Sequence, residues 1–382
     1  MGTSKISLLA ALYIFSAVHF AFAQTWTQTD APTNDWDSIA SSSDGTKLVA
    51  AGGGGIYIST NGGVTWTQTA APTNEDWASI ASSSDGTKLV AAGGGGIAIS
   101  TNGGATWTQT AAPTNEDWAS IASSSDGTKL AAVFGYPSGG IYISTNAGVT
   151  WIQTGAPTSG YYQSVASSGD GTQLAAAAAY GGIYTSTNGG VTWTLTGAPD
   201  GYWQSITSSS DGTKLAACDN FGIYTSTNGG VTWTKTSMPV NPWGSIASSS
   251  DGIKLAAEII ESALIYTSTN AGVTWTQTTA PWGNWHCIAS TADGTKLATV
   301  ASGGGIWTLQ TTPNPLMCIT LNNDNAVLSW TVPPTNFVLQ ESSDLFDWAD
   351  MTNQPILNLT NLRDEIALPV SGGKAFYRLK AP

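Results

Sequence analysis

Charge is scarce in this 382-residue chain, in which charged residues make up 10% and hydrophobic residues 41%. Arginine is the rarest charge, because Arg363 and Arg378 are the two copies and both lie near the C-terminus. Such a composition argues against disorder, which requires few hydrophobic residues and high charge. The net charge of −13 and the lack of a basic stripe exclude nucleic acid and an anionic membrane as expected partners.

Cysteine and histidine are almost as scarce. Cys218, Cys287 and Cys318 cannot form a disulfide framework, and their spacing matches no zinc site. At most one bridge can form, and the sequence leaves open whether Cys287 pairs with Cys318. His286 is the one histidine beyond the N-terminal segment, so no histidine cluster supports a transition metal. We therefore predict neither a metal nor a cofactor.

Long hydrophobic runs are absent except at the N-terminus. There, Lys5 precedes an apolar stretch from Ile6 to Phe20, and the small-x-small segment Ala21-Phe22-Ala23 follows. This pattern predicts a signal peptide over residues 1–23, since the stretch is short for a membrane anchor. We expect a secreted monomer, whether extracellular, periplasmic or at the cell surface, with no membrane insertion after cleavage.

Repetition is what the chain has in abundance. The string DGTKL, or a close variant, occurs seven times, starting at Asp44, Asp85, Asp126, Asp170, Asp211, Asp251 and Asp293. The string STNGGVTW, or a close variant, occurs six times at spacings of 40 to 44 residues, starting at Ser59, Ser100, Ser144, Ser186, Ser226 and Ser268. Periods of this length with several short strands indicate the blades of a β-propeller.

One repeat can be divided into four strands joined by tight turns at Asp44-Gly45 and Asn61-Gly62-Gly63. The expected strands are Trp36–Ser41, 47–51, 56–59 and 65–69. The seventh repeat lacks a fourth strand, whereas Thr25–Thr29 near the N-terminus matches one. We therefore predict an all-β, seven-bladed propeller over residues 24–312, with this N-terminal strand closing the last blade so that neither blade exposes an edge.

The second glycine of the Asn-Gly-Gly turn never varies, whereas the first becomes Ala147 and Ala271 in two copies. A left-handed backbone at the second position would explain the difference, because a Cβ atom is penalised there.

The string STNGGVTW resembles the Asp-box, or BNR repeat, of pattern S-x-D-x-G-x-T-W. That repeat occurs in sialidases, some glucan-cleaving glycosidases, sortilin-like receptors and the photosystem II assembly factor. The resemblance implies a propeller fold and no single function. Asparagine replaces the aspartate in all six copies, and it can still fix the turn through backbone hydrogen bonds: Asn61, Asn102, Asn146, Asn188, Asn228 and Asn270.

Residues 313–382 form a separate segment after Pro313 and Pro315. The short alternating runs LSWTV, FVLQESSDLFDW and AFYRLK predict a small β-sandwich-like domain. It is similar to small fibronectin-like domains of secreted bacterial proteins, for which a passive stabilising or sorting role is expected.

Catalysis finds little support. A sialidase would need three arginines to grip a carboxylate, and the propeller has none. A glycosidase needs two carboxylates in different environments, yet most candidates repeat between blades. These candidates are Asp35, Asp37, Glu75, Asp76, Glu116 and Asp117. We assign no catalytic residue.

The loops that join strands two and three, and the connections between blades, differ from repeat to repeat and share one end of the propeller. Diversity confined to loops on a regular scaffold is typical of a binding surface. Candidate ligand-binding aromatics begin the first strands: Trp36, Trp77, Trp118, Tyr162, Trp203, Trp243 and Trp285. Candidate carboxylates are Asp35, Asp76 and Asp117, with Asp200, Asp219, Glu258 and Glu261 on the same loops.

We therefore expect a non-catalytic binding or scaffold protein that recognises a glycan or a peptide. The alternatives are a carbohydrate-active hydrolase with paired carboxylates and a purely structural surface or matrix protein. For the seven aromatics, the alternative to ligand contact is packing between blades.

Overall fold

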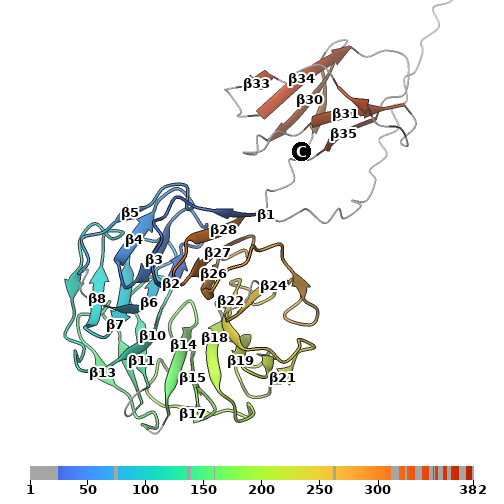
Figure 1. Cartoon of the computed structure of the whole chain (residues 1–382). Helices are drawn as coiled ribbons and strands as arrows, with labels where there is room; N and C mark the ends of the chain where they lie inside the picture. The colour runs from blue at the N-terminus through green and yellow to red at the C-terminus, as the bar shows by residue number, and fades with distance from the viewer. Residues whose placement is uncertain are drawn as a thin grey trace, which may run out of the picture. The chain divides into compact units, whose positions relative to one another are not determined.

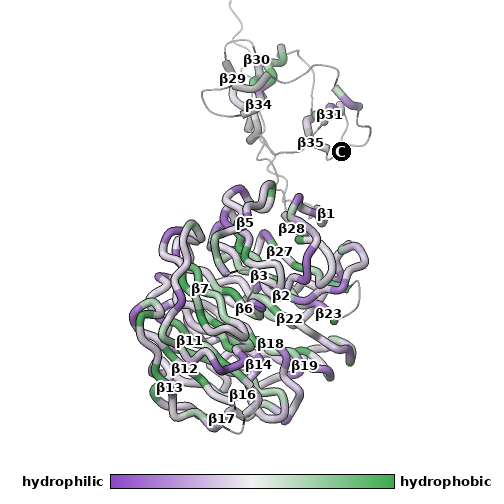
Figure 2. Tube along the Cα trace, turned by 60° about the vertical axis from the view of Figure 1, so that its left-hand side comes forward, coloured by the Kyte–Doolittle hydropathy of each residue, from purple (hydrophilic) through white to green (hydrophobic). Residues whose placement is uncertain are grey.

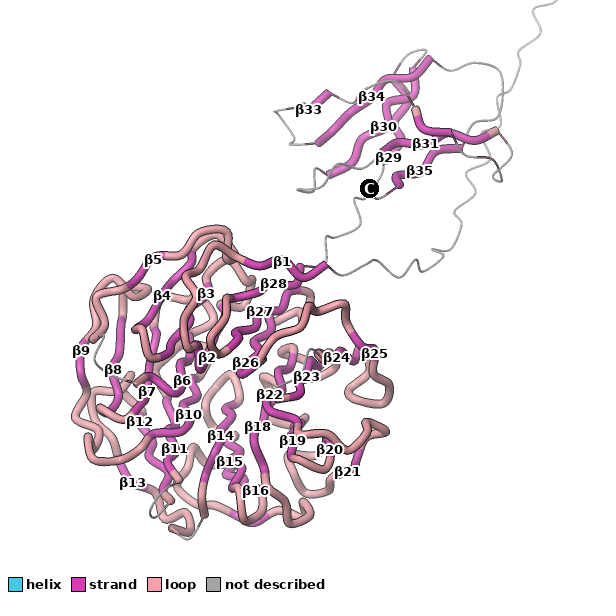
Figure 3. Tube along the Cα trace, in the orientation of Figure 1, coloured by secondary structure: helices cyan, strands magenta, loops and turns pink. Residues whose placement is uncertain are grey.

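A computed structural model describes residues 25–310, apart from 73–75, 136–138, 159 and 261–263, and mainly the strands between 318 and 380. The predicted signal peptide lies outside the described residues. The chain divides into two compact units, residues 1–310 and 311–382. All elements of the described parts are strands (Figure 3). No helix there is long and apolar enough to cross a membrane.

The first unit is a seven-bladed propeller, as predicted (Figure 1). Each blade is an antiparallel sheet of four strands taken from the centre outward, and the first blade contains β2 (Trp36–Ser41), β3 (Leu48–Gly52), β4 (Gly55–Ser59) and β5 (Thr67–Gln68). The outermost strand is shorter than the predicted 65–69, and such short edges limit pairing with other chains.

The next five blades repeat this order. Blade two has β6 (Trp77–Ser82), β7 (Leu89–Gly93), β8 (Gly96–Ser100) and β9 (Thr108–Gln109). Blade three has β10 (Trp118–Ser123), β11 (Leu130–Phe134), β12 (Gly140–Ser144) and β13 (Ile152–Gln153). Blade four has β14 (Tyr162–Ser167), β15 (Leu174–Ala178), β16 (Ile183–Ser186) and β17 (Thr194–Leu195). Blade five has β18 (Trp203–Ser208), β19 (Leu215–Asp219), β20 (Gly222–Ser226) and β21 (Thr234–Lys235). Blade six has β22 (Trp243–Ser248), β23 (Leu255–Ile259), β24 (Ile265–Ser268) and β25 (Thr276–Gln277).

Blade seven confirms the predicted closure. It contains β26 (Trp285–Ser290), β27 (Lys296–Ala301) and β28 (Ile306–Gln310), and β1 (Thr25–Gln28) pairs with β28 as the fourth strand. Trp26 is buried and donates a hydrogen bond from Nε1 to Thr278 Oγ1 of blade six, at 3.0 Å. The two ends of the propeller chain are therefore joined within one sheet.

The core lies between neighbouring blades, where the small residues of each second strand face the next blade. Figure 2 shows this as hydrophobic colour concentrated on the inner strands. In β15 and its equivalents all five residues are buried, and alanine predominates in most of them because adjacent sheets approach closely. These strands read as continuous apolar runs since both of their faces are covered.

Serine hydroxyls accept hydrogen bonds from the innermost strands, which pair with a second strand on their outer edge and with no strand on their inner edge. Ser38 Oγ accepts a hydrogen bond from the Ile80 backbone N–H of the next blade at 3.1 Å, and Ser79 Oγ accepts from Ile121 in the same way. Six such bonds run from blade to blade, with Ser120, Ser164, Ser205 and Ser245 as the other acceptors. At the seventh junction Cys287 occupies the serine position.

The end of the propeller that bears the Asp-Gly turns is called here the DG face. On it, the backbone N–H before each turn donates to the corresponding carbonyl of the next blade, from Ser43 to Ser84 and onward until Ala292 donates back to Ser43. Six lysines reinforce this circle, because each ammonium donates to the carbonyl of the next blade's turn aspartate: Lys47, Lys88, Lys129, Lys214, Lys254 and Lys296. The DG face is thus a closed hydrogen-bonded ring.

The Asn-Gly-Gly turns also lie on the DG face, and asparagine fixes them as expected. Asn61 Oδ1 accepts from the Thr65 N–H at 2.9 Å, and Ser59 Oγ accepts from the Gly63 N–H at 2.9 Å. The second glycine has φ of 84° to 92° in all six copies, which confirms the left-handed backbone. The first position is left-handed too, but its φ of 55° at Ala147 and Ala271 lies in the small region open to alanine.

The C-terminal unit contains two small sheets. One has the order β29 (Cys318–Asn322), β30 (Asn325–Thr331), β34 (Arg363–Pro369), β33 (Ile356–Asn358), and the other β32 (Ala349–Asp350), β31 (Val338–Ser342), β35 (Phe376–Lys380). Leu328, Ile366 and Leu368 of the first sheet pack with Leu339 of the second. The two sheets therefore share a core.

Candidate binding face

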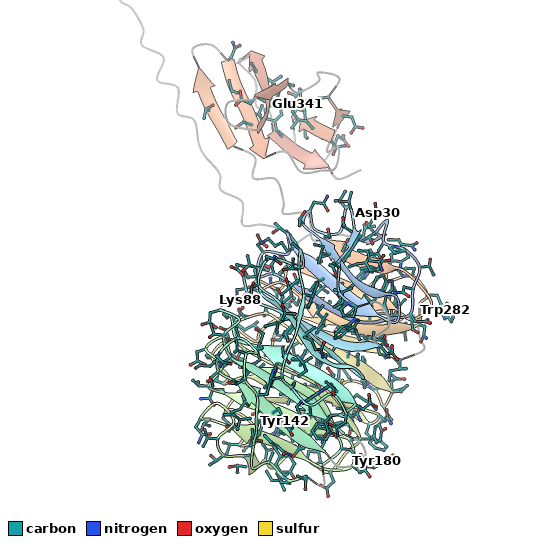
Figure 4. All side chains as sticks on the ribbon, turned by 90° about the vertical axis from the view of Figure 1, so that its left-hand side faces the viewer. Asp30, Lys88, Tyr142, Tyr180, Trp282 and Glu341 are labelled. Atoms are coloured by element: carbon teal, nitrogen blue, oxygen red, sulfur yellow. The ribbon has the colours of Figure 1, made fainter. Side chains whose placement is uncertain are left out.

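The end of the propeller opposite the DG face is called here the variable face. It carries the loops between second and third strands and the connections between blades. Figure 4 shows the propeller from the side, with Lys88 of the DG face at one edge and Tyr180 and Trp282 of these loops at the other. Glycine lines the loops of blades one, two and seven, whereas bulky side chains occupy those of blades four and five.

The seven aromatics predicted to bind a ligand are buried instead. Trp36, Trp77, Trp118, Tyr162, Trp203 and Trp243 are 0% exposed, and Trp285 is 1% exposed. Trp118 Nε1 donates to the Pro113 carbonyl at 3.0 Å, and the Tyr162 hydroxyl donates to Pro157 at 2.9 Å. The prediction of ligand contact by these rings is corrected, because they hold the connections between blades against the core.

The residue before each buried aromatic differs in chemical character between blades of the propeller. It is Asp35, Asp76 and Asp117 for the first three blades, and all three are exposed, as a ligand-binding role requires. It is Tyr161 and Tyr202 for blades four and five. One repeat position thus forms an acidic arc of three aspartates that is followed around the circle by two tyrosines.

Three tyrosines form a continuous cluster on this face, in which Tyr161 and Tyr180 are exposed and Tyr202 is partly buried. The Tyr180 ring, from the β15–β16 loop, lies 6.0 Å from the Tyr161 ring centroid and 4.8 Å from the Tyr202 centroid, with edge-to-face geometry at both. Tyr180 is 76% exposed, which leaves most of its ring in contact with water. Partial burial and the neighbouring Tyr180 raise the pKa of the Tyr202 hydroxyl. Further exposed hydrophobic residues on the loops of this face are Phe221, Val240 and Trp282.

Each innermost strand contains a β-bulge directly after its aromatic, and this bulge position breaks the repeat symmetry most clearly. Its occupants are Asp37, Ala78, Ala119, Gln163, Gln204, Gly244 and His286. Its two ionisable occupants, Asp37 and His286, meet at the junction of blades one and seven. His286 Nδ1 donates to the Asp37 carbonyl at 2.9 Å, so Nε2 faces Asp37 Oδ1 at 4.0 Å.

Asp37 is the most perturbed carboxylate of the variable face. Burial raises its pKa to about 6 against the lowering effect of His286, and Asp76 and Asp35 raise it further. The carboxylates of Asp76 and Asp35 therefore lie close enough to Asp37 to disfavour its ionisation. In the sequence analysis Asp37 was one of six candidate carboxylates. It is the one aspartate among the seven bulge positions, and this difference between the repeats could have identified it in advance.

Two acidic residues assigned to the face from sequence are not available there. Asp219 is buried, and its carboxylate accepts a hydrogen bond from the Phe221 N–H at 2.8 Å. Glu258 is fully buried between blades six and seven, where Thr299 Oγ1 lies 2.9 Å from Oε2 while Oε1 has no partner. Burial raises the pKa of Glu258 to about 8, so it is largely neutral at pH 7. Glu261 lies outside the described residues.

The charges of the two faces differ. On the DG face seven turn aspartates accompany six lysines. On the variable face Lys235 is the one lysine among the described residues, against these carboxylates: Asp30, Asp35, Asp37, Asp76, Glu116, Asp117 and Asp200. The described residues contain no group of three histidine, cysteine or acidic side chains able to hold a metal ion, and Cys218 and Cys287 are free thiols.

No protein-family model and no curated protein matches the chain. Solved structures do match it. YCF48 bound to D1 peptide is 16% identical with a TM-score of 0.58 over 75% of this chain and 96% of that one. YCF48 from Cyanidioschyzon merolae is 17% identical, also with a TM-score of 0.58, over 75% and 98%. An ancestral GH74 enzyme is 17% identical with a TM-score of 0.56, over 81% of this chain and 54% of that one. These likenesses establish the fold alone.

Proposed function

We propose that this chain is a secreted, non-catalytic binding protein that recognises a peptide segment on its variable face. The observation that carries the proposal is the cluster of Tyr161, Tyr180 and Tyr202, whose central ring, Tyr180, is 76% exposed. These rings contribute little to the core, whereas the seven buried aromatics account for the packing between blades. Tyrosine suits a binding surface because it offers a large amphipathic contact area at a low cost in conformational entropy.

A structural neighbour supports this choice of ligand. One structural neighbour, YCF48, has a structure with a bound peptide, so a propeller of this kind can serve as a peptide receptor. The Asp-box resemblance of the Ser-Thr-Asn-Gly-Gly turns favours the same superfamily. We further propose that the C-terminal unit is a small β-sandwich that stabilises or sorts the protein, since its two sheets share one apolar cluster.

A selection experiment tests the proposal. The protein without residues 1–23 is panned against a library of displayed 12-residue peptides and applied to a glycan array. We expect peptide binders whose affinity falls at least tenfold in Tyr180→Ala and is unchanged in Val231→Ala, a control exposed on the DG face. Selective binding to glycans would show that the ligand is a sugar and not a peptide. Binding to neither the peptide library nor the glycan array would favour a purely structural protein.

Asp37 supports a second candidate, a carbohydrate-active hydrolase. Asp37 is half-buried with a pKa of about 6, whereas Asp76 is exposed, so the two carboxylates have the different environments that a glycosidase needs. Such an enzyme would lose activity as the pH rises above about 6, because Asp37 would then be deprotonated. Release of reducing sugar from soluble β-glucans by the wild type, abolished in Asp37→Asn, would establish the hydrolase. No release from any glucan tested would exclude these substrates.

A further inference from the structure

We infer that the variable face selects a basic segment, one that carries lysine or arginine beside aromatic or other apolar residues. The inference rests on the proposed function and names the chemistry of its ligand. It follows from where the acidic arc and the tyrosine cluster lie relative to each other and from the charge of the face.

Charge complementarity determines whether the bound segment should be basic or acidic. The lysines of the DG face are already engaged with the carbonyls of the next blade, and the turn aspartates beside them accept local hydrogen bonds from serine and threonine. Asp35, Asp76 and Asp117 are exposed, and within the described part of the chain none of them forms an ion pair. Burial disfavours ionisation of Asp37, and repulsion from the nearby carboxylates of Asp76 and Asp35 adds to this effect. A cationic side chain at this place relieves that repulsion, whereas an anionic one increases it.

The tyrosine cluster adds the apolar half of the site. Most of the Tyr180 ring is exposed, and lysine or arginine stacks on accessible aromatic faces through cation–π attraction. The chain already contains one example nearby, because the Lys235 ammonium lies 5.7 Å from the centroid of the Tyr224 ring. The cluster occupies blades four and five, and the acidic arc directly precedes it around the circle. A short extended segment can therefore contact both.

The C-terminal unit is a poor internal candidate for this ligand. Residues 313–382 contain four basic residues, Arg363, Lys374, Arg378 and Lys380, against seven acidic ones. The acidic residues are Asp324, Glu341, Asp344, Asp347, Asp350, Asp364 and Glu365. We therefore commit to a separate basic polypeptide as the partner.

Fluorescence anisotropy with matched peptides tests the inference on the full chain without residues 1–23. The probes are labelled (Lys-Ser-Tyr-Gly)3 and the same peptide with glutamine or glutamate in place of lysine. We expect the lysine peptide to bind at least tenfold more tightly than the glutamine peptide in 50 mM NaCl, and to lose most of this advantage in 500 mM NaCl through screening.

Variants locate the effect. Joint replacement of Asp35, Asp76 and Asp117 by asparagine should remove the preference for lysine and leave the glutamine peptide's affinity unchanged. Tyr180→Ala should weaken both peptides, and Glu341→Gln in the C-terminal unit should weaken neither. Equal affinity for the three peptides would overturn the basic partner while preserving the proposed function. Failure of all peptides, library binders included, would overturn both.

Discussion

The ammonium of Lys296, in the last blade, donates a hydrogen bond to the backbone carbonyl of Asp44 in the first blade, at 2.9 Å. The same bond joins Lys47 to Asp85 and recurs at most other junctions. At the closing junction it connects residues 252 positions apart in sequence. The ring is thus closed on the DG face by these side chains and at its rim by the pairing of β1 with β28, so both closing contacts can be tested by substitution.

The first prediction concerns the N-terminal strand. Trp26→Ala should lower the free energy of unfolding by about 3–5 kcal/mol, because it removes a buried ring that stacks on Trp285 with centroids 6.4 Å apart. Chemical denaturation measures this change. Trp282→Ala is the control, since that ring is 80% exposed. Equal effects of the two substitutions would contradict the closing role of β1.

The second prediction concerns the hydrogen bonds that the side chains of buried aromatics donate, which should contribute to stability. At Trp118, replacement by phenylalanine should destabilise the protein by about 1 kcal/mol beyond replacement by tyrosine, because phenylalanine leaves the partly buried Pro113 carbonyl without its donor. Tyrosine is the natural residue at this position of blade four, where Tyr162 donates to Pro157. If the two variants have the same melting temperature, the hydrogen bond contributes nothing to stability.

The ring of serine acceptors gives a paired prediction. Ser79→Ala should destabilise the protein by about 1–3 kcal/mol, because the buried N–H of Ile121 loses its acceptor. Cys287→Ser should raise stability by up to about 1 kcal/mol, because it would place an oxygen at the one junction where the thiol lies 3.9 Å from Ser38 Oγ. A stabilising Ser79→Ala, or a strongly destabilising Cys287→Ser, would show that these groups do not link the blades.

Glu258 should make stability fall with rising pH. Its pKa is about 8 in the folded protein and has an ordinary value of 4.5, so between these values the unfolded chain loses the proton that the folded chain retains. Stability should therefore decrease from about pH 4.5 to 8, with a slope of at most about 1.4 kcal/mol per pH unit, and change little from this group above pH 8. Glu258→Gln should abolish that dependence in melting curves recorded from pH 5 to 8.

A second variant separates burial from charge at this site. Val300 occupies the equivalent strand position in blade seven, so Glu258→Val restores an apolar side chain that the repeat already accepts. We expect it to be more stable than the wild type at pH 8. A less stable Glu258→Val at pH 8 would indicate that Glu258 makes favourable contacts beyond those with Thr299.

The propeller could be predicted from the sequence because each repeat encodes its own turns. The turns at Asp44-Gly45 and Asn61-Gly62-Gly63 fix the hairpins locally. The strand-like segment at Thr25, which belongs to no complete repeat, revealed how the last blade is closed. The binding face was harder to predict. Trp36 and its equivalents suit a ligand platform and a packed interface equally well in sequence, and only the neighbouring blade decides between them. Tyr180 joins Tyr161 and Tyr202 across two connections, which no local pattern specifies.

The central claim is that ligand contact and blade packing are divided between different aromatics of the same face. The measurement that tests it most directly compares Tyr180→Ala with Trp118→Ala for affinity toward a selected peptide and for melting temperature. We predict that Tyr180→Ala loses at least tenfold in affinity at an unchanged melting temperature, whereas Trp118→Ala lowers the melting temperature strongly. Unchanged binding by a fully folded Tyr180→Ala would contradict the account.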